Sequence, residues 1–222
     1  MKFKALIALS ASVAAIGCTT GGLVGQGPNR SIAPGVAQQA AQQHPQIVQE
    51  FGGTVDAQRA SYVSAVGRRV GAQSGIRSGY NFTALNSPVM NAFAVPGGYI
   101  YITRQLMGLM NDEAELASVL GHEIGHVAAD HSAGRQQQSI WSQILSVGAA
   151  VLTGSSELGQ IVGQVAQLRV LSYSRAQEFQ ADELGIRYLA GAGYDPNAAG
   201  TLLASLGAAT ALEARGSGGK DE

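Results

Sequence analysis

The sequence predicts an α+β fold that is mostly helical, with a short antiparallel sheet beside one helix that carries an unusual motif. Apolar residues recur at helical spacing over most of the chain, and strand-like alternation is confined to three short central segments. The motif is His122-Glu123-Ile124-Gly125-His126. With 45% hydrophobic and 13% charged residues, the 222-residue chain can bury a substantial core.

The individual elements follow from these patterns and from the turn residues between them. Strands are expected at 81–85, 93–95 and 99–103, with Pro96-Gly97-Gly98 as the turn between the last two. Helices are expected at 36–50, 55–72, 104–110, 112–131, 174–192 and 196–213. Residues 134–172 are expected to form a packed helical hairpin; the alternative is a segment that touches a membrane or covers a site.

The N-terminal residues have the pattern of a targeting signal. Two lysines precede an apolar run, Ala5 to Ile16, that is too short for a permanent membrane span. Ala15-Ile16-Gly17-Cys18 resembles a bacterial lipobox, which implies removal of residues 1–17 and a lipid on Cys18. Thr19, rather than an aspartate, favours the outer membrane by analogy with lipoprotein sorting. The alternative is an ordinary secretory signal with an incidental cysteine.

Composition limits the remaining possibilities. A formal net charge of −1 gives no electrostatic support for nucleic-acid binding. Because Cys18 is the only cysteine, no disulfide can form within the chain. Residues 18–35 are expected to be a flexible tether and residues 214–222 a disordered tail.

The central motif has the spacing of a metal site. Two histidines four residues apart lie about 40° apart around a helix axis, and neutral imidazoles on one face suit zinc. Glu123, directly after the first histidine, can take a proton from a metal-bound water, as in a zinc peptidase. Asp112 is expected to cap this helix, with Glu115 completing a capping box. Gly121 and Gly125 would allow another segment or a substrate to come close.

A hydrolytic zinc site needs a third protein ligand and an open position for water. His131 lies five residues after His126, about 140° around the helix, so we expect a structural or rim position for it. Glu178 and Asp182 share one face of a predicted helix; one can bind the metal while the other accepts the ring N–H of a ligand histidine. The alternative is that both are solvated charges near arginines.

Three motifs together resemble a known family. They are residues 111–117 leading into the His122–His126 motif, Ser174 to Asp182, and Asn91 to Gly98. In these segments the chain is similar to gluzincin metallopeptidases of the HtpX and CAAX-prenyl-protease type, over roughly residues 55–212. It looks more like the compact periplasmic lipoprotein members than the multi-spanning ones.

The resemblance implies a zincin-like zinc metallopeptidase domain at 36–213 that holds one Zn²⁺ per chain. The implied ligands are His122, His126 and Glu178. Glu123 would be the general base, and Asp182 would accept a hydrogen bond from a ligand histidine, His122.

The expected function is a zinc-dependent metalloendopeptidase that cleaves unfolded or misassembled envelope proteins at the periplasmic face, close to envelope assembly machinery. Substrate would add as a strand beside Asn91, Ala92 and Phe93. The candidates that could stabilise an oxyanion are Arg175, Tyr173, Tyr194 and His131, and the sequence does not choose among them. An envelope chaperone or assembly factor with a latent or structural zinc site is the main alternative. A membrane-embedded protease is another, if residues 140–170 enter the bilayer.

Overall fold

The computed structural model describes residues 31–76, 79–132, 143–149 and 173–217. At its centre is a three-stranded sheet made of β1 (Asn81–Leu85), β2 (Ala92–Val95) and β3 (Tyr99–Thr103), in the order β1-β3-β2. The α+β fold is therefore as predicted, but the sheet is mixed rather than antiparallel. The β2–β3 pair is the expected antiparallel hairpin, whereas β1 joins the other side of β3 in parallel, with Asn81 opposite Tyr99.

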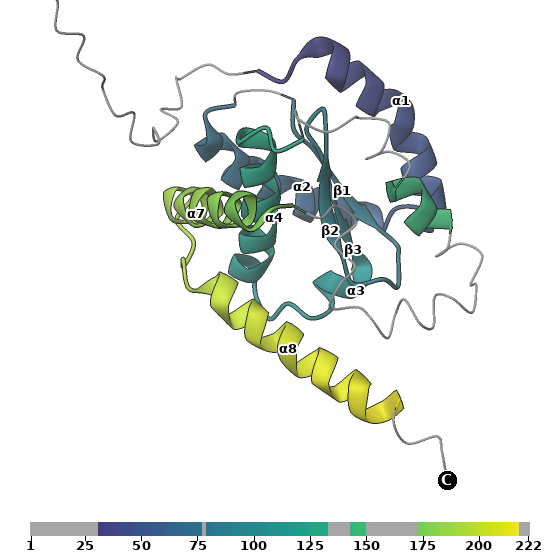
Figure 1. The fold of residues 1–222 in the computed structure, drawn as a ribbon, viewed down its shortest axis with the longest axis vertical. Coiled ribbons are helices and arrows are strands. Elements are labelled where there is room, and N and C mark those ends of the chain that lie inside the picture. Colours follow the sequence, from purple (N-terminus) through teal and green to yellow (C-terminus); the bar gives the residue numbers. More distant parts are fainter. Residues whose placement is uncertain (1–30, 77–78, 133–142, 150–172, 218–222) are drawn as a thin grey trace, which may run out of the picture.

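Helices surround this sheet, and Figure 1 shows α1 on one side of it and α2, α4 and α7 on the other. Their bounds are α1 Pro34–Glu50, α2 Ala57–Gly71 followed by the 3₁₀ turn η1 Ala72–Ser74, α3 Arg104–Met107, α4 Glu113–Ala128, α7 Arg175–Gly191 and α8 Ala198–Ser217. Residues 143–149 are also helical.

Three helix ends differ from the prediction by three residues or more. The helix expected at 104–110 ends at Met107, and the one expected at 112–131 ends at Ala128. In contrast, α8 continues to Ser217, so the predicted domain boundary at residue 213 falls inside a helix. The signal peptide, Cys18 and most of the 134–172 segment lie outside the described residues.

The strands bury both faces, and their alternation divides the core in two. One face packs against α2 and α4 through Phe82, Ala84, Ala94, Ile100 and Ile102, and α7 joins the same core through its contacts with α4 and α2. The opposite face packs against α1 and Ile144 through Leu85, Phe93, Val95 and Tyr101. The sheet therefore separates two apolar cores, of which the first borders the motif helix.

The hairpin turn requires both of its glycines. Gly97 and Gly98 have φ values of 97° and 82°, in the left-handed region that favours glycine. A Cβ atom on Gly97 would also lie 2.7 Å from the Cβ of Ala40 on α1. The turn that joins β2 to β3 is thus fixed by backbone conformation and by contact with α1.

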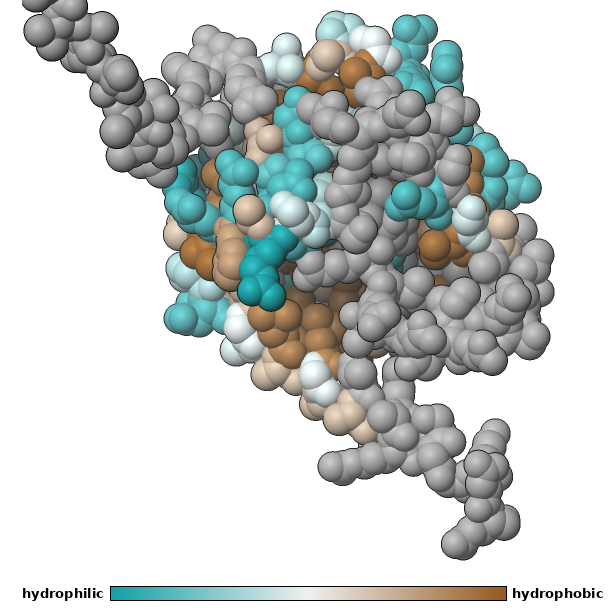
Figure 2. All heavy atoms as spheres, viewed as in Figure 1, coloured by the Kyte–Doolittle hydropathy of each residue, from teal (hydrophilic) through white to brown (hydrophobic). Residues whose placement is uncertain are grey.

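None of the helices in the described part of the chain combines the length and the apolar character needed to cross a bilayer. In the coloured part of the face shown in Figure 2, polar and apolar side chains are interspersed, and apolar side chains gather along the first turns of α8. In this helix Leu202 is buried and Leu203 is 68% exposed.

Candidate metal centre

Helix α4 presents the motif because its other residues fix how the helix is rotated. The Asp112 side chain accepts a hydrogen bond from the backbone N–H of Glu115 at 2.9 Å and so caps the helix. Leu116, Leu120 and Ile124 recur every four residues and are fully buried. The predicted capping box is present only in its Asp112 half, because the Glu115 carboxylate accepts from the backbone N–H of Asn111 instead.

Helix α7 crosses α4 at very short range. A Cβ atom on Gly125 would lie 2.7 Å from the carbonyl oxygen of Ala181, and one on Gly185 would lie 2.9 Å from the backbone nitrogen of His122. Only small residues allow two helix backbones to approach so closely. The predicted close approach at Gly121 and Gly125 is therefore made by α7, and it brings the first turns of α7 over the motif.

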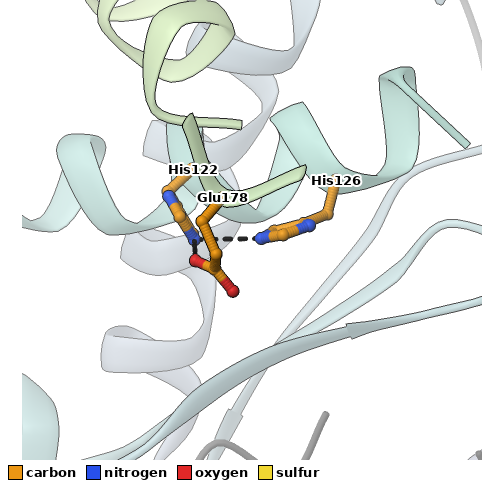
Figure 3. A group of neighbouring side chains, drawn as sticks. All are labelled: His122, His126 and Glu178. Atoms are coloured by element: carbon orange, nitrogen blue, oxygen red, sulfur yellow. Dashed lines mark hydrogen bonds and ion pairs between the residues drawn. The ribbon is translucent and has the colours of Figure 1, made fainter. Parts of the chain in front are cut away.

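This crossing assembles three metal-ligating side chains from two helices (Figure 3). His122 Nε2 lies 3.0 Å from His126 Nε2 and 3.6 Å from Glu178 Oε2. All three side chains offer donor atoms that lie within 4.8 Å of one another. A tetrahedral ion about 2.0–2.1 Å from each donor sets neighbouring donors about 3.3 Å apart, so the observed spacing and the donor types fit zinc.

Asp182 contacts the first of these histidines, His122, on the ring edge away from the cluster. Its Oδ1 lies 2.8 Å from His122 Nδ1, one turn along α7 from Glu178. Because a carboxylate only accepts, His122 Nδ1 carries the hydrogen and Nε2 keeps its lone pair toward the cluster. Burial lowers the pKa of His122, but the Asp182 hydrogen bond and the charges of Glu123, Asp182 and Glu178 outweigh it and raise the pKa. The negative charges of these three carboxylates thus favour a cation beside the His122 ring.

Glu123 lies beside the cluster and is 8% exposed. Its charge is among those that raise the pKa of His122. A buried carboxylate next to three metal-ligating groups has the location required for proton transfer at that site.

His131 lies closer to the cluster than helical geometry predicted. Because α4 ends at Ala128, the chain turns back at Asp130, which has a φ of 54°, and the His131 backbone N–H donates to the His126 carbonyl at 3.1 Å. His131 Nδ1 then lies 2.9 Å from His126 Nδ1, on the ring edge opposite the cluster. The angle of about 140° assumed a helix that continues to residue 131. An aspartate, tolerated in the left-handed region, was the available signal for this turn.

The other oxyanion candidates lie in different places. The Tyr173 ring stacks on the His126 ring with centroids 3.9 Å apart. Arg175 is exposed at the first position of α7, one turn before Glu178. Tyr194 lies away from the cluster: its hydroxyl donates to Glu113 at 2.6 Å, at the far end of α4 from the histidines.

The predicted substrate strand is at the sheet edge in the described structure, since β2 pairs only with β3 there. Asn91, just before β2, is 7% exposed, and within the described residues its Nδ2 has no hydrogen-bond partner. The Phe93 side chain is buried on the α1 side of the sheet and stacks on Tyr101 at 4.9 Å. The part of Phe93 that remains for a substrate is therefore its backbone.

Together, the mixed sheet and the His-Glu-x-x-His helix crossed by a second ligand helix define a helix-borne metal centre of the metallopeptidase kind. Residues 57–215 match the model of "Peptidase family M48". The chain belongs to this family. Zinc is the cofactor of the family, and His122, His126 and Glu178 are the group of described residues that can hold it.

Several curated proteins are similar to this chain. Mitochondrial metalloendopeptidase OMA1 of Arabidopsis thaliana is 36% identical over 124 residues, which cover 55% of this chain and 25% of the relative. The β-barrel assembly-enhancing protease of Yersinia pestis is 33% identical over 157 residues, 65% of this chain and 32% of the relative. Metalloprotease LoiP of Escherichia coli K12 is 30% identical over 129 residues, 57% of this chain and 51% of the relative.

The first two of these relatives are much longer, and the chain spans a quarter to a third of their length. The resemblance predicted from the sequence is confirmed for the family, Peptidase family M48, but not specifically for the HtpX and CAAX-prenyl-protease type. None of the relatives named here is an HtpX or a CAAX prenyl protease.

Proposed function

We propose that this chain is a zinc-dependent metalloendopeptidase that cleaves unfolded or misassembled proteins of the bacterial cell envelope. The observation that carries the proposal is the cluster of His122, His126 and Glu178, with the buried Glu123 beside it. The names of the relatives from Yersinia pestis and Arabidopsis thaliana add support, since both are proteases.

Each side chain has a role that its surroundings support. His122, His126 and Glu178 would hold the zinc, which when bound lowers the pKa of water and polarises a peptide carbonyl. Glu123 would accept the proton of the attacking water and deliver it to the leaving amine. Asp182 would keep the His122 hydrogen on Nδ1. For the oxyanion we propose Arg175, an exposed cation in the turn of α7 before Glu178.

Substrate would bind in an extended form along β2. An edge strand offers backbone N–H and C=O groups that read little sequence, which suits unfolded chains. Asn91 adds a buried amide donor, and leaving such a donor unpaired costs about 1–3 kcal/mol. A substrate carbonyl would remove that cost, so Asn91 is the side chain we assign to substrate, with Ala92 and Phe93 contributing backbone.

The proposed location depends on the N-terminal sequence. A lipid on Cys18 would tether the domain to the outer membrane at its periplasmic face, as the lipobox-like residues indicate. Such an anchor would hold the enzyme where envelope proteins assemble, and the β-barrel assembly-enhancing proteases carry that process in their name. Intact mass of the protein from bacterial membranes should give a chain that starts at a lipidated Cys18; an unmodified chain from Met1 would contradict the anchor.

The central test is Glu123→Gln in the full chain. The carboxamide cannot take a proton, so the zinc-loaded variant should bind one zinc and unfold at the wild-type temperature but cleave unfolded casein at least about 100-fold more slowly. Proteolysis is followed by release of labelled peptides.

The control is Glu183→Gln, because Glu183 is on the exposed side of α7 and pairs with Arg187 at 2.9 Å. This variant should cleave like the wild type. If wild type and Glu123→Gln cleave casein equally slowly while both bind it, the chain is a binding or assembly factor and the peptidase proposal is overturned.

A further inference from the structure

We propose that His131 is a positioning residue that fixes the ring of the ligand His126 and keeps its Nε2 unprotonated for zinc. The inference rests on the proposed zinc site and adds a residue that does not itself reach the donor cluster. The observation behind it is a chain of three side chains, His126, His131 and Gln180, joined by two short hydrogen bonds.

The direction of these bonds follows from the amide at the end of the chain. Gln180 Oε1 lies 3.0 Å from His131 Nε2, and an amide oxygen can only accept. His131 Nε2 therefore carries the hydrogen, which leaves His131 Nδ1 as an acceptor in the neutral ring. His126 Nδ1, 2.9 Å away, must then donate, so the lone pair of the His126 ring is on Nε2.

That lone pair is the one that would bind the metal, since His126 Nε2 lies in the donor cluster, 3.0 Å from His122 Nε2. The two ligand histidines thus have the same tautomer but different partners. For His122 the acceptor is the Asp182 carboxylate, and for His126 it is the neutral imidazole of His131. A second hydrogen bond of this kind orients a metal-bound histidine.

His131 is held firmly enough to do this. It is 6% exposed, its backbone N–H donates to the His126 carbonyl, and its own carbonyl accepts from Gln177 Nε2 at 3.3 Å. Gln177 Oε1 in turn accepts from the backbone N–H of Ser174 in the capping box that starts α7.

These hydrogen bonds form a second link between the two ligand helices, in addition to their close contact at Gly125 and Gly185. Gln177 and Gln180 lie on either side of Glu178, so the helix turn that supplies the third ligand also supports His131. The orientation of His126 is thereby tied to the position of α7. A histidine that only filled the core would not need both ring nitrogens bonded along this path.

The test measures zinc affinity and ring tautomers in the full chain. His131→Leu removes the acceptor and should raise the zinc dissociation constant about 10–100-fold, measured by competition with a fluorescent chelator. His131→Asn should stay within a few-fold of wild type, because the Asn Oδ1 can accept from His126 Nδ1. His44→Leu is the matched control: it removes another hydrogen-bonded histidine, on α1, and should leave zinc affinity unchanged.

Nitrogen-15 NMR spectra of the zinc-loaded wild type report which ring nitrogens carry hydrogen, without a substitution that could disturb the fold. The inference expects hydrogen on His126 Nδ1 and on His131 Nε2, with His131 Nδ1 bare. Hydrogen on His131 Nδ1, or equal zinc affinity of the wild type and His131→Leu, overturns the inference while the zinc site stands. A wild type that binds no zinc overturns the proposed function and this inference together.

Discussion

The two histidines of the cluster have different hydrogen-bond partners. Asp182 is an exposed carboxylate, and His131 is a buried imidazole. The carboxylate adds negative charge near the cluster, which helps to raise the pKa of His122. Removing it should therefore weaken the attraction for a dication as well as the orientation of the ring.

At this scale we predict that Asp182→Ala raises the zinc dissociation constant about 10–100-fold. The loss comes from a His122 ring that can rotate or carry its hydrogen on Nε2, where it blocks the metal. Competition with a chelator measures it. Glu183→Ala, one residue along α7 and paired with Arg187, is the matched control and should bind zinc like the wild type. Equal affinities for all three proteins would contradict the role of Asp182.

The site residues that share a helix face were predictable from sequence. His122 with His126, and Glu178 with Asp182, are four residues apart, so a single helix places each pair. His131 was not predictable in this way, because its position depends on where α4 ends rather than on its period. Tyr194 was a candidate by residue type alone, and its position beside Glu113 depends on a tertiary contact that periodicity does not give.

Among the elements, the α4–α7 crossing is the contact on which the cluster depends. Its glycines cost helix propensity, about 1 kcal/mol each relative to alanine in a helix interior. The close packing of the two helix backbones offsets that cost. Larger residues would prevent this packing, because a Cβ atom on Gly125 or Gly185 would collide with the backbone of the facing helix.

We predict that Gly125→Ala lowers the free energy of unfolding by about 1–3 kcal/mol, despite the better helix propensity of alanine, because its Cβ would meet the Ala181 carbonyl. Zinc affinity should fall as α7 moves away. Gly207→Ala is the control: nothing lies within 4 Å of the added Cβ in α8, and up to about 1 kcal/mol of stabilisation is expected. Urea unfolding of the two variants compares them directly, and a stabilised Gly125→Ala would refute the close-packing argument.

Most elements were predictable, but the direction of β1 was not. The Pro96-Gly97-Gly98 turn identifies β2 and β3 as a hairpin, since turn residues act locally. Nothing local links β1 to β3, and their parallel pairing depends on the connection from Asn86 through β2. Sequence periodicity gives the face of a strand and not its partner.

The two apolar cores of the molecule differ in the residues through which they border the site. The core between the sheet and α2, α4 and α7 includes Leu120 and Ile124 of the helix that carries the two histidines. The other core holds α1 against the sheet and includes Tyr173 at its border, whose ring also stacks on His126. Tyr173 thus lies between the second core and the His126 ring.

We predict that mild acid loosens this second core through His44. Burial lowers the pKa of His44, and its Nδ1 is 2.9 Å from the hydroxyl of the fully buried Tyr101. A histidine with a lowered folded-state pKa stabilises the fold above its unfolded value of about 6.5, and this contribution is lost as the pH falls from there through the folded value.

The measurement is the change in unfolding free energy between about pH 8 and about pH 5 for the wild type and for His44→Asn, which keeps an acceptor but does not titrate. The wild type should lose more stability than the variant over this interval. Identical losses of unfolding free energy would mean that the neutral form of His44 does not stabilise the fold.

The contact between the α4 and α7 backbones also bears on the size of the ion. Because no side chains separate the helices at Gly125 and Gly185, repacking cannot widen the space between the histidines and Glu178. Ca²⁺ takes six to eight oxygen ligands at about 2.3–2.6 Å and would need both a wider space and more oxygens. The same glycines that bring the two helices together thus disfavour an ion as large as Ca²⁺ by geometry as well as by donor type.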